Sequence, residues 1–202
     1  MQLFTNIAIS SIVQFILLSV IPFIWWLITA RKENTFFQWI GYKKPHTSDR
    51  KRFWSIIIII EIVFLSAFLV IMPLVYDNTS LATSQFYGMG ISAIIPALIY
   101  AFFQTSFNEE LFFRGFLGKR LIKKFGFAFG NTLQGVIFGS MHGIMLYSSA
   151  GLLKAVIISV LTGAIGICMG YVCEKQAEGS LIPSWLMHGT FNTLSSLSVM
   201  FL

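Results

Sequence analysis

Three short polar clusters interrupt segments that are otherwise apolar and long enough to cross a membrane. The first contains Glu109 and Glu110 with Arg114, the second is His142, and the third pairs His188 with Asn192. A charged side chain at the centre of a bilayer costs about 2.5–3.5 kcal/mol on insertion scales, so these groups are expected to face a protein interior or a wet cavity. A purely structural protein could avoid most of this cost, and each cluster is therefore a candidate functional site.

Together the clusters contain a carboxylate, two imidazoles and an amide, which are the groups that amide hydrolysis needs. A base activates water, an imidazole orients the water or binds a metal, and a neutral donor stabilises the oxyanion. His188 and Asn192 are four residues apart and would share one helix face. Glu109, His142 and His188 would also fit a zinc site with an open position, although the His-Glu-x-x-His signature is absent. The residues alone leave the use of a metal open.

The two adjacent carboxylates are expected to have different roles. Glu110 and Arg114 are four residues apart and can form an ion pair, whereas the helical repeat turns Glu109 about 100° away. We expect Glu110 and Arg114 to shape the site, and Glu109 to act as the general base in an interior cavity. In the alternative interpretation, all three charges form an interfacial cluster whose side chains reach toward water.

The composition indicates an integral membrane protein. Of the 202 residues, 56% are hydrophobic and 11% are charged, which lies outside the usual range of soluble domains. The net charge is +6, but the basic residues lie between apolar segments, so nucleic acid is not an expected partner. No Lys or Arg precedes Arg31, and the first apolar segment is expected to be a retained span rather than a signal peptide. Cys168 and Cys173 are expected to be unpaired packing residues.

With about 20 apolar residues per crossing, the sequence predicts an all-α bundle of six transmembrane helices. They are placed near residues 6–30, 53–76, 86–107, 127–147, 152–173 and 181–202. Residues 108–125 are predicted to be a mixed helical segment: its first half continues the third span, and its second half forms a basic interfacial turn at 119–124. The whole chain, 1–202, is expected to be a single membrane domain, with 31–52 as a cytoplasmic loop.

The distribution of basic residues predicts the orientation in the cell membrane. Segments 31–52 and 119–124 are rich in Lys and Arg, whereas 77–84 and 147–151 contain neither, so both termini are predicted to lie outside. On this count Glu109 lies shallow on the cytoplasmic side, and His142 lies about 20 Å up the next span. We nevertheless expect Glu109, His142 and His188 to converge in a cavity open to the cytoplasm. This requires the fourth helix to tilt, to start late or to begin outside the lipid.

Two further features of the spans have simpler interpretations. Ser159, Gly163, Gly166 and Gly170 recur at helical spacing, and such a stripe is typical of close helix packing rather than of a ligand groove. Glu61 interrupts the second span. It could hydrogen-bond a neighbouring helix or belong to a proton or substrate path, and it is not assigned to the catalytic set.

The motifs, taken in order, resemble the CPBP intramembrane protease family, which contains type II CAAX prenyl endopeptidases and bacteriocin-processing or immunity proteins. The resemblance covers about residues 90–200, the protease-like core, and rests on Glu109-Glu110-x-x-x-Arg114, Phe138-x-x-x-His142, Gly179-Ser180-Leu181 with Pro183, and His188-x-x-x-Asn192. It implies a membrane endopeptidase in which Glu109 and His142 activate water. His188 and Asn192 would stabilise the oxyanion, while Glu110, Arg114 and Phe138 would shape the site.

The resemblance implies either a zinc-dependent metalloprotease or a glutamate-dependent, metal-free hydrolase. We favour the metal-free form, because His188 and Asn192 project together and an amide is a better oxyanion donor than metal ligand. The expected substrate is a peptide or a membrane-associated protein cleaved near the cytoplasmic surface, with membrane lipid as the surroundings, and nothing in the sequence requires it to be prenylated. Two other classes remain open. One is a non-catalytic regulator or bacteriocin-immunity protein of the same fold, and the other is a small transporter that uses Glu61, Glu109 and the histidines.

Overall fold

The computed structural model describes residues 2–75 and 82–201, and these residues form helices and turns without any strand. The α-helices are α1 (Gln2–Thr29), α2 (Phe36–Ile40), α3 (Arg50–Val75), α4 (Ile94–Ile99), α5 (Asn108–Glu110), α6 (Lys119–Phe125), α7 (Phe127–Ala150), α8 (Leu152–Tyr171) and α9 (Ile182–Met200). The 3-10 turns are Ala82–Phe86 and Gly90–Ala93, and the π-helical turns are Tyr100–Phe107, Leu111–Gly118 and Val172–Gln176. The all-α class predicted from the sequence is confirmed.

Four helices in the described part of the chain are long and apolar enough to cross a membrane. They span Gln2–Thr29, Arg50–Ile71, Gly90–Phe125 and Leu152–Gln176, and they identify a multi-pass membrane protein. Many apolar side chains of α1 and α3 are exposed, including Leu17, Ile28, Ile59 and Val70, as expected for lipid-facing helices. Helices α7 and α9 are 24 and 19 residues long but carry the polar residues of the second and third clusters. Six crossings therefore remain a prediction.

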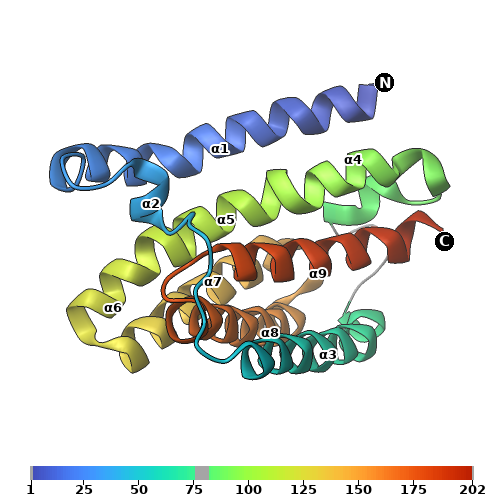
Figure 1. Cartoon of the computed structure of the whole chain (residues 1–202). Helices are drawn as coiled ribbons and strands as arrows, with labels where there is room; N and C mark the ends of the chain where they lie inside the picture. The colour runs from blue at the N-terminus through green and yellow to red at the C-terminus, as the bar shows by residue number, and fades with distance from the viewer. Residues whose placement is uncertain (1, 76–81, 202) are drawn as a thin grey trace.

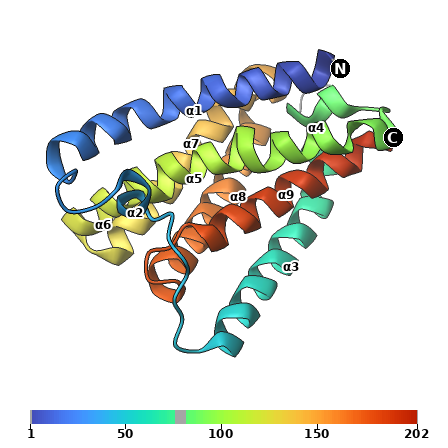
Figure 2. The ribbon, with the colours of Figure 1, turned by 45° about the horizontal axis from the view of Figure 1, so that its top comes forward.

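The third of these helices is the central element of the bundle. It runs without a break over 36 residues, Gly90–Phe125, and lies between α1 and α9 in both views (Figures 1 and 2). The first half of the 108–125 segment continues the third span, as predicted, but the predicted turn at 119–124 is wrong, because these residues continue the same helix. Two π-helical turns flank α5, the short stretch that carries Glu109 and Glu110. Such wider turns occur frequently at functional sites.

A tight turn at Gly126 explains how two distant motifs reach the same height. Gly126 has φ +80° and separates α6 from α7. Glu109 lies almost as many residues before Gly126 as His142 lies after it. In an antiparallel pair of helices such residues lie side by side, so the predicted depth difference of about 20 Å between them does not exist. The error came from placing the turn at 119–124, where the helix in fact continues.

Helices α7 and α8 approach each other through the predicted stripe of small residues. A Cβ atom on Gly139 of α7 would lie 2.1 Å from the carbonyl oxygen of Ser159 and 2.8 Å from the Cα of Gly163, both on α8. Gly166 of α8 in turn leaves room for Phe138, because an added Cβ would lie 3.2 Å from that ring. The stripe is therefore a packing surface, and it fixes the position of the α7 turn that carries Phe138 and His142.

Substitution of Gly139 is expected to separate these two helices. Gly139→Val places two methyl groups against the α8 backbone, and overpacking of this kind typically costs about 1–3 kcal/mol. We expect a lower midpoint in thermal unfolding of the purified protein. Val136→Leu is the matched control on the same helix, because Val136 is 52% exposed, and it should change the midpoint little. Equal midpoints for the two variants would show that the close approach does not hold the helices together.

Candidate active site

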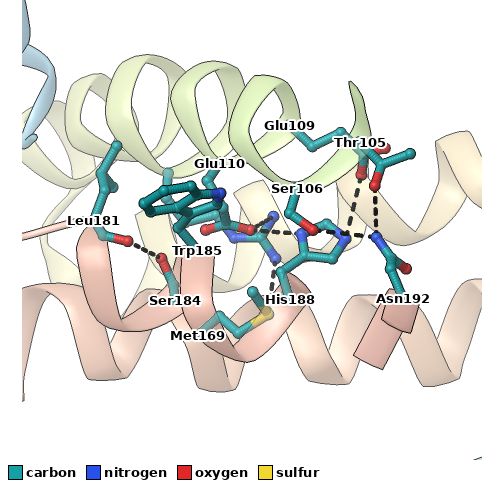
Figure 3. A network of polar contacts seen from close by, with 12 residues as sticks. Thr105, Ser106, Glu109, Glu110, Met169, Leu181, Ser184, Trp185, His188 and Asn192 are labelled. Atoms are coloured by element: carbon teal, nitrogen blue, oxygen red, sulfur yellow. Dashed lines mark hydrogen bonds and ion pairs between the residues drawn. The ribbon is translucent and has the colours of Figure 1, made fainter. Parts of the chain in front are cut away.

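Side chains from three helices meet on one side of the central helix. Glu109 and Glu110 come from α5, Phe138 and His142 from α7, and His188 from α9. Figure 3 shows Glu109, Glu110 and His188 directed toward one another across the space between the central helix and α9. The three polar clusters of the sequence therefore form one site.

Glu109 stands between the two histidines. Its carboxylate oxygen Oε2 lies 3.8 Å from Nε2 of His142 and 3.8 Å from Nε2 of His188. The three side chains are 13%, 25% and 11% exposed, in the order Glu109, His142, His188. The side chains are thus only partly buried, although Oε2 of Glu109 itself is a buried atom. Glu109, His142 and His188 thus lie together, as predicted from the sequence.

The hydrogen bonds at the other ring nitrogens determine which nitrogen of each neutral histidine carries the hydrogen. Nδ1 of His142 lies 2.9 Å from the carbonyl oxygen of Phe138, and a carbonyl oxygen can only accept, so Nδ1 donates. Nδ1 of His188 lies 3.0 Å from Oε1 of Glu110, which is an ion-paired carboxylate and therefore also accepts. In the neutral rings both Nε2 atoms are acceptors and face Oε2 of Glu109. That oxygen is buried and has no hydrogen-bond partner among the described residues, so three acceptors surround one point.

Glu110 and Arg114 form the predicted ion pair. Nη1 of Arg114 lies 3.1 Å from Oε1 of Glu110, and the two side chains are 1% and 0% exposed. The same oxygen accepts from Nδ1 of His188. Glu110 therefore holds the imidazole whose opposite nitrogen faces Glu109, so the two adjacent carboxylates act on the two sides of one ring.

Phe138 lies at the centre of the site. The guanidinium carbon of Arg114 lies 4.1 Å from the centroid of its ring, a distance typical of cation–π contacts. The ring centroids of His142 and His188 lie 4.5 Å and 6.1 Å from it. Arg114 also places Nη2 3.8 Å from the sulfur of Met169 on α8. The Phe138 ring thus separates the buried ion pair from His142.

Asn192 is held by the turn of the central helix that precedes Glu109. Its Nδ2 donates to Oγ1 of Thr105 at 2.7 Å and to Oγ of Ser106 at 3.2 Å. The Thr105 hydroxyl lies 3.1 Å from the carbonyl oxygens of Tyr100 and Ala101, to which it donates. The Asn192 amide therefore already donates to two hydroxyls, and a role as an oxyanion donor would require one of these bonds to exchange.

The predicted zinc ligands can be compared with the geometry that zinc requires. Tetrahedral zinc with ligands at about 2.0–2.1 Å separates neighbouring donor atoms by roughly 3.4 Å. Glu109 Oε2 lies 3.8 Å from each histidine nitrogen, and no group of three His, Cys, Asp or Glu side chains within residues 2–75 and 82–201 has the arrangement of a metal site. These separations are wider than those of a closed tetrahedral zinc centre, and no step of the mechanism below passes through a metal.

Several contacts of the site were not predicted from the sequence. The spacing of Thr105 and Glu109, four residues apart, would have placed both on one face of the central helix. The bond between Glu110 and His188, and the contact of Arg114 with Met169, depend on tertiary packing and leave no signal in residue spacing. Glu61 lies on α3 and Cys168 and Cys173 are free thiols, and none of the three contributes to the cluster.

A comparison with protein families agrees with the resemblance found in the motifs. The family described as Type II CAAX prenyl endopeptidase Rce1-like matches residues 91–194, which is just over half of the 202 residues. The chain belongs to this family. The matched region contains Glu109, Glu110, Arg114, Phe138, His142, His188 and Asn192. Searches among curated proteins and among solved structures found no significant match. The chain is therefore a member of a membrane protease family.

Proposed function

We propose that this protein is an intramembrane peptidase that hydrolyses a peptide bond of its substrate, with Glu109 as the general base. The observation that carries the proposal is the position of Glu109 Oε2, 3.8 Å from Nε2 of both His142 and His188. Acceptors directed at one point need a hydrogen donor between them, and a water molecule provides two hydrogens, one for Oε2 of Glu109 and one for Nε2 of His142. The proposed substrate is a peptide or a membrane-associated protein.

In the proposed reaction, Glu109 and His142 activate the water. Nε2 of His142 accepts one hydrogen bond and orients the water, while Oε2 of Glu109 removes the other hydrogen as the water oxygen attacks the carbonyl carbon of the substrate. The carbonyl oxygen becomes an oxyanion. When the carbon–nitrogen bond breaks, the proton held by Glu109 passes to the departing amine nitrogen. General acid–base catalysis of this kind typically contributes about 10²–10⁴-fold to a rate.

His188 and Asn192 are the proposed donors to the oxyanion. His188 donates once Nε2 has taken up a proton from solvent, and the positive ring then faces the Glu110 carboxylate, whose Oε1 lies 3.0 Å from Nδ1. Asn192 joins it by exchanging its longer bond, that to Ser106 at 3.2 Å, for the oxyanion. Hydrogen bonds to a charged group are stronger than those between neutral groups. Donation by His188 and by Asn192 is therefore favoured when negative charge develops on the substrate.

The proposed topology has six crossings, with the site open to the cytoplasmic side. The described chain begins and ends at one end of the bundle, and α2 and α6 lie at the other (Figures 1 and 2). The basic residues Lys119, Arg120, Lys123 and Lys124 belong to α6 or start it. The tendency of basic loops to stay in the cytoplasm then places both termini outside.

Peptide-cleavage profiling tests the proposal. Purified protein in lipid nanodiscs is incubated with a mixture of peptides, and new termini are identified by mass spectrometry. We expect wild-type protein to cleave, and His142→Ala to lose about 10²-fold or more of the rate. His46→Ala is the matched control, because His46 lies outside the site, and it should cleave normally. A non-catalytic regulator of the same fold would cleave nothing and would keep its biological activity after His142→Ala.

Removal of metal ions is expected to leave the rate within about twofold. The expectation follows from the donor separations of 3.8 Å, which are wider than those of a tetrahedral zinc site. The measurement compares cleavage before and after incubation with 1,10-phenanthroline, with its non-chelating isomer 1,7-phenanthroline as control. A loss caused only by the chelator and reversed by added Zn²⁺ would overturn the metal-free mechanism.

A further inference from the structure

A segment outside the family match places one side chain against the site. The backbone on both sides of Tyr42 is bonded to the turn that precedes α9. The carbonyl oxygen of Gly41 accepts from the amide of Leu181 at 2.9 Å, and that of Lys43 accepts from Oγ of Ser180 at 2.6 Å. The hydrogen bonds of Gly41 and Lys43 thereby fix the backbone on both sides of Tyr42. This part of the predicted cytoplasmic loop 31–52 is packed against the bundle.

Gly41 is the residue that allows this docking. It has φ +108°, a conformation that L side chains rarely adopt, and an added Cβ would lie 2.6 Å from the carbonyl oxygen of Gly179. The loop therefore approaches the turn before α9 more closely than any other residue at position 41 would permit.

The ring of Tyr42 is directed into the bundle. Its centroid lies 4.7 Å from that of Phe107 and 5.9 Å from that of Trp185. Phe107 precedes Glu110 by three residues, and Trp185 precedes His188 by three residues. Each aromatic residue therefore lies about one helical turn before a partner in the Glu110–His188 hydrogen bond. Trp185 is itself fixed, because its Nε1 donates to the carbonyl oxygen of Phe102 at 2.7 Å. The phenol ring is thus packed against residues one helical turn from Glu110 and His188.

Four buried polar atoms of Arg114, Glu110 and Tyr42 lack hydrogen bonds within the described residues. They are Nε and Nη1 of Arg114, Oε2 of Glu110 and the hydroxyl oxygen of Tyr42, while the closest contacts of Arg114 and His188 with Glu110 go to its other oxygen, Oε1. Ser184 is a second hydroxyl close to Glu110, and its one hydrogen is directed to the carbonyl oxygen of Leu181 at 3.1 Å. Burial raises the pKa of Tyr42, and the negative charge of Glu110 raises it further, so the phenol keeps its proton and remains a donor. Buried polar groups are nearly always paired.

We propose that Tyr42 is a positioning residue of the active site, and that its hydroxyl supplies the hydrogen bond that the free oxygen of Glu110 lacks. The bond fixes the second oxygen of a carboxylate whose first oxygen orients His188. Tyr42 acts through Glu110 and does not touch the substrate. Its part in catalysis rests on the function proposed above, whereas its contact with Glu110 can be measured without any substrate.

The sign of a stability change tests the contact. If the Tyr42 hydroxyl were truly unpartnered, Tyr42→Phe would remove a buried orphan group and raise the midpoint of thermal unfolding. If it donates to Glu110, the substitution leaves the carboxylate oxygen without a partner and lowers the midpoint. We expect a lower midpoint for Tyr42→Phe. An unchanged or higher midpoint would overturn the proposal.

A spectroscopic signature separates positioning from general packing. The chain contains three histidines, so ¹⁵N-histidine labelling gives few ring signals, which single His variants assign. We expect Tyr42→Phe to shift the Nδ1 signal of His188, and Tyr171→Phe, whose hydroxyl accepts from Gln176 at 2.9 Å, to leave it in place. An unshifted His188 signal in Tyr42→Phe would refute the positioning role, even if peptide cleavage were never observed.

If the protein cleaves peptides, the kinetics give a second readout. We expect Tyr42→Phe to lower kcat about 3–10-fold at unchanged KM, as for loss of a contact that orients a catalytic group. Added to Glu110→Gln, it should cause little further loss, since both act on the same carboxylate. The proposal would be contradicted if kcat of Tyr42→Phe were unchanged. It would also be contradicted if the fold-loss of kcat in the double variant equalled the product of the two single losses. Failure of wild-type protein to cleave would instead count against the proposed function alone.

Discussion

Glu109→Gln is expected to lower kcat for peptide cleavage by about 10²–10⁴-fold while leaving the fold unchanged. Glutamine has nearly the same shape, but its amide cannot take a proton from water. The side chain is 13% exposed and makes no hydrogen bond through Oε2 within the described part of the chain, so its replacement removes no structural contact at that atom. Rates are measured by mass spectrometry on protein in nanodiscs, and the fold by circular dichroism and thermal unfolding.

The matched control for this substitution is Glu61→Gln. Glu61 is a carboxylate inside a different apolar crossing, on α3, and it contributes nothing to the site. It should cleave at the wild-type rate. A loss in Glu61→Gln as large as that in Glu109→Gln would show that intramembrane carboxylates act here through topology or transport rather than through chemistry.

Arg114→Met is expected to produce the largest loss of stability in the chain. The side chains of Arg114 and Glu110 are 1% and 0% exposed, and Nη1 lies 3.1 Å from Oε1. Removal of one partner of such a pair leaves an uncompensated buried charge, typically at a cost of about 3–5 kcal/mol. The cation–π contact with Phe138 is lost as well. The measurement is the midpoint of thermal unfolding in detergent, together with the yield of folded protein.

Two comparisons show whether the charge itself causes the loss. Lys119→Met breaks the pair with Glu174, in which the side chains are 20% and 22% exposed, and the bond to the carbonyl oxygen of Gly179. Because both charges are partly solvated, it should cost less than Arg114→Met. The double variant Glu110→Gln with Arg114→Met removes both charges, and it should be more stable than Arg114→Met alone. If Arg114→Met proved no worse than Lys119→Met, the pair would have no structural role.

The sequence predicts the helical class and the placement of most helices, because apolar length and basic loops are strong local signals in membrane proteins. It does not predict the true end of the third helix. Lys119 to Lys124 carry charge typical of an interfacial turn, yet they continue a helix whose end depends on Gly126. That error of a few residues produced the false difference in depth between Glu109 and His142.

The residue types of the site are predictable, but only part of their pairing is. The ion pair of Glu110 and Arg114 follows from a spacing of four residues within one helix. The bond between Glu110 and His188 joins residues 78 positions apart, and the bonds of Asn192 to Thr105 and Ser106 depend on how α9 packs on the central helix. Tyr42 lies in a segment with no motif, and its relation to the site follows only from the docking of its backbone.

A double-mutant cycle on Glu109 and His142 tests most directly whether the two residues act on one water molecule. The rates of peptide cleavage are compared for wild type, Glu109→Gln, His142→Ala and the double variant in the same nanodiscs. We expect each single substitution to remove most of the rate and the second to add less than about tenfold, because residues that act as a unit are strongly non-additive. Losses that multiply in full, or undiminished cleavage by Glu109→Gln, would contradict the account.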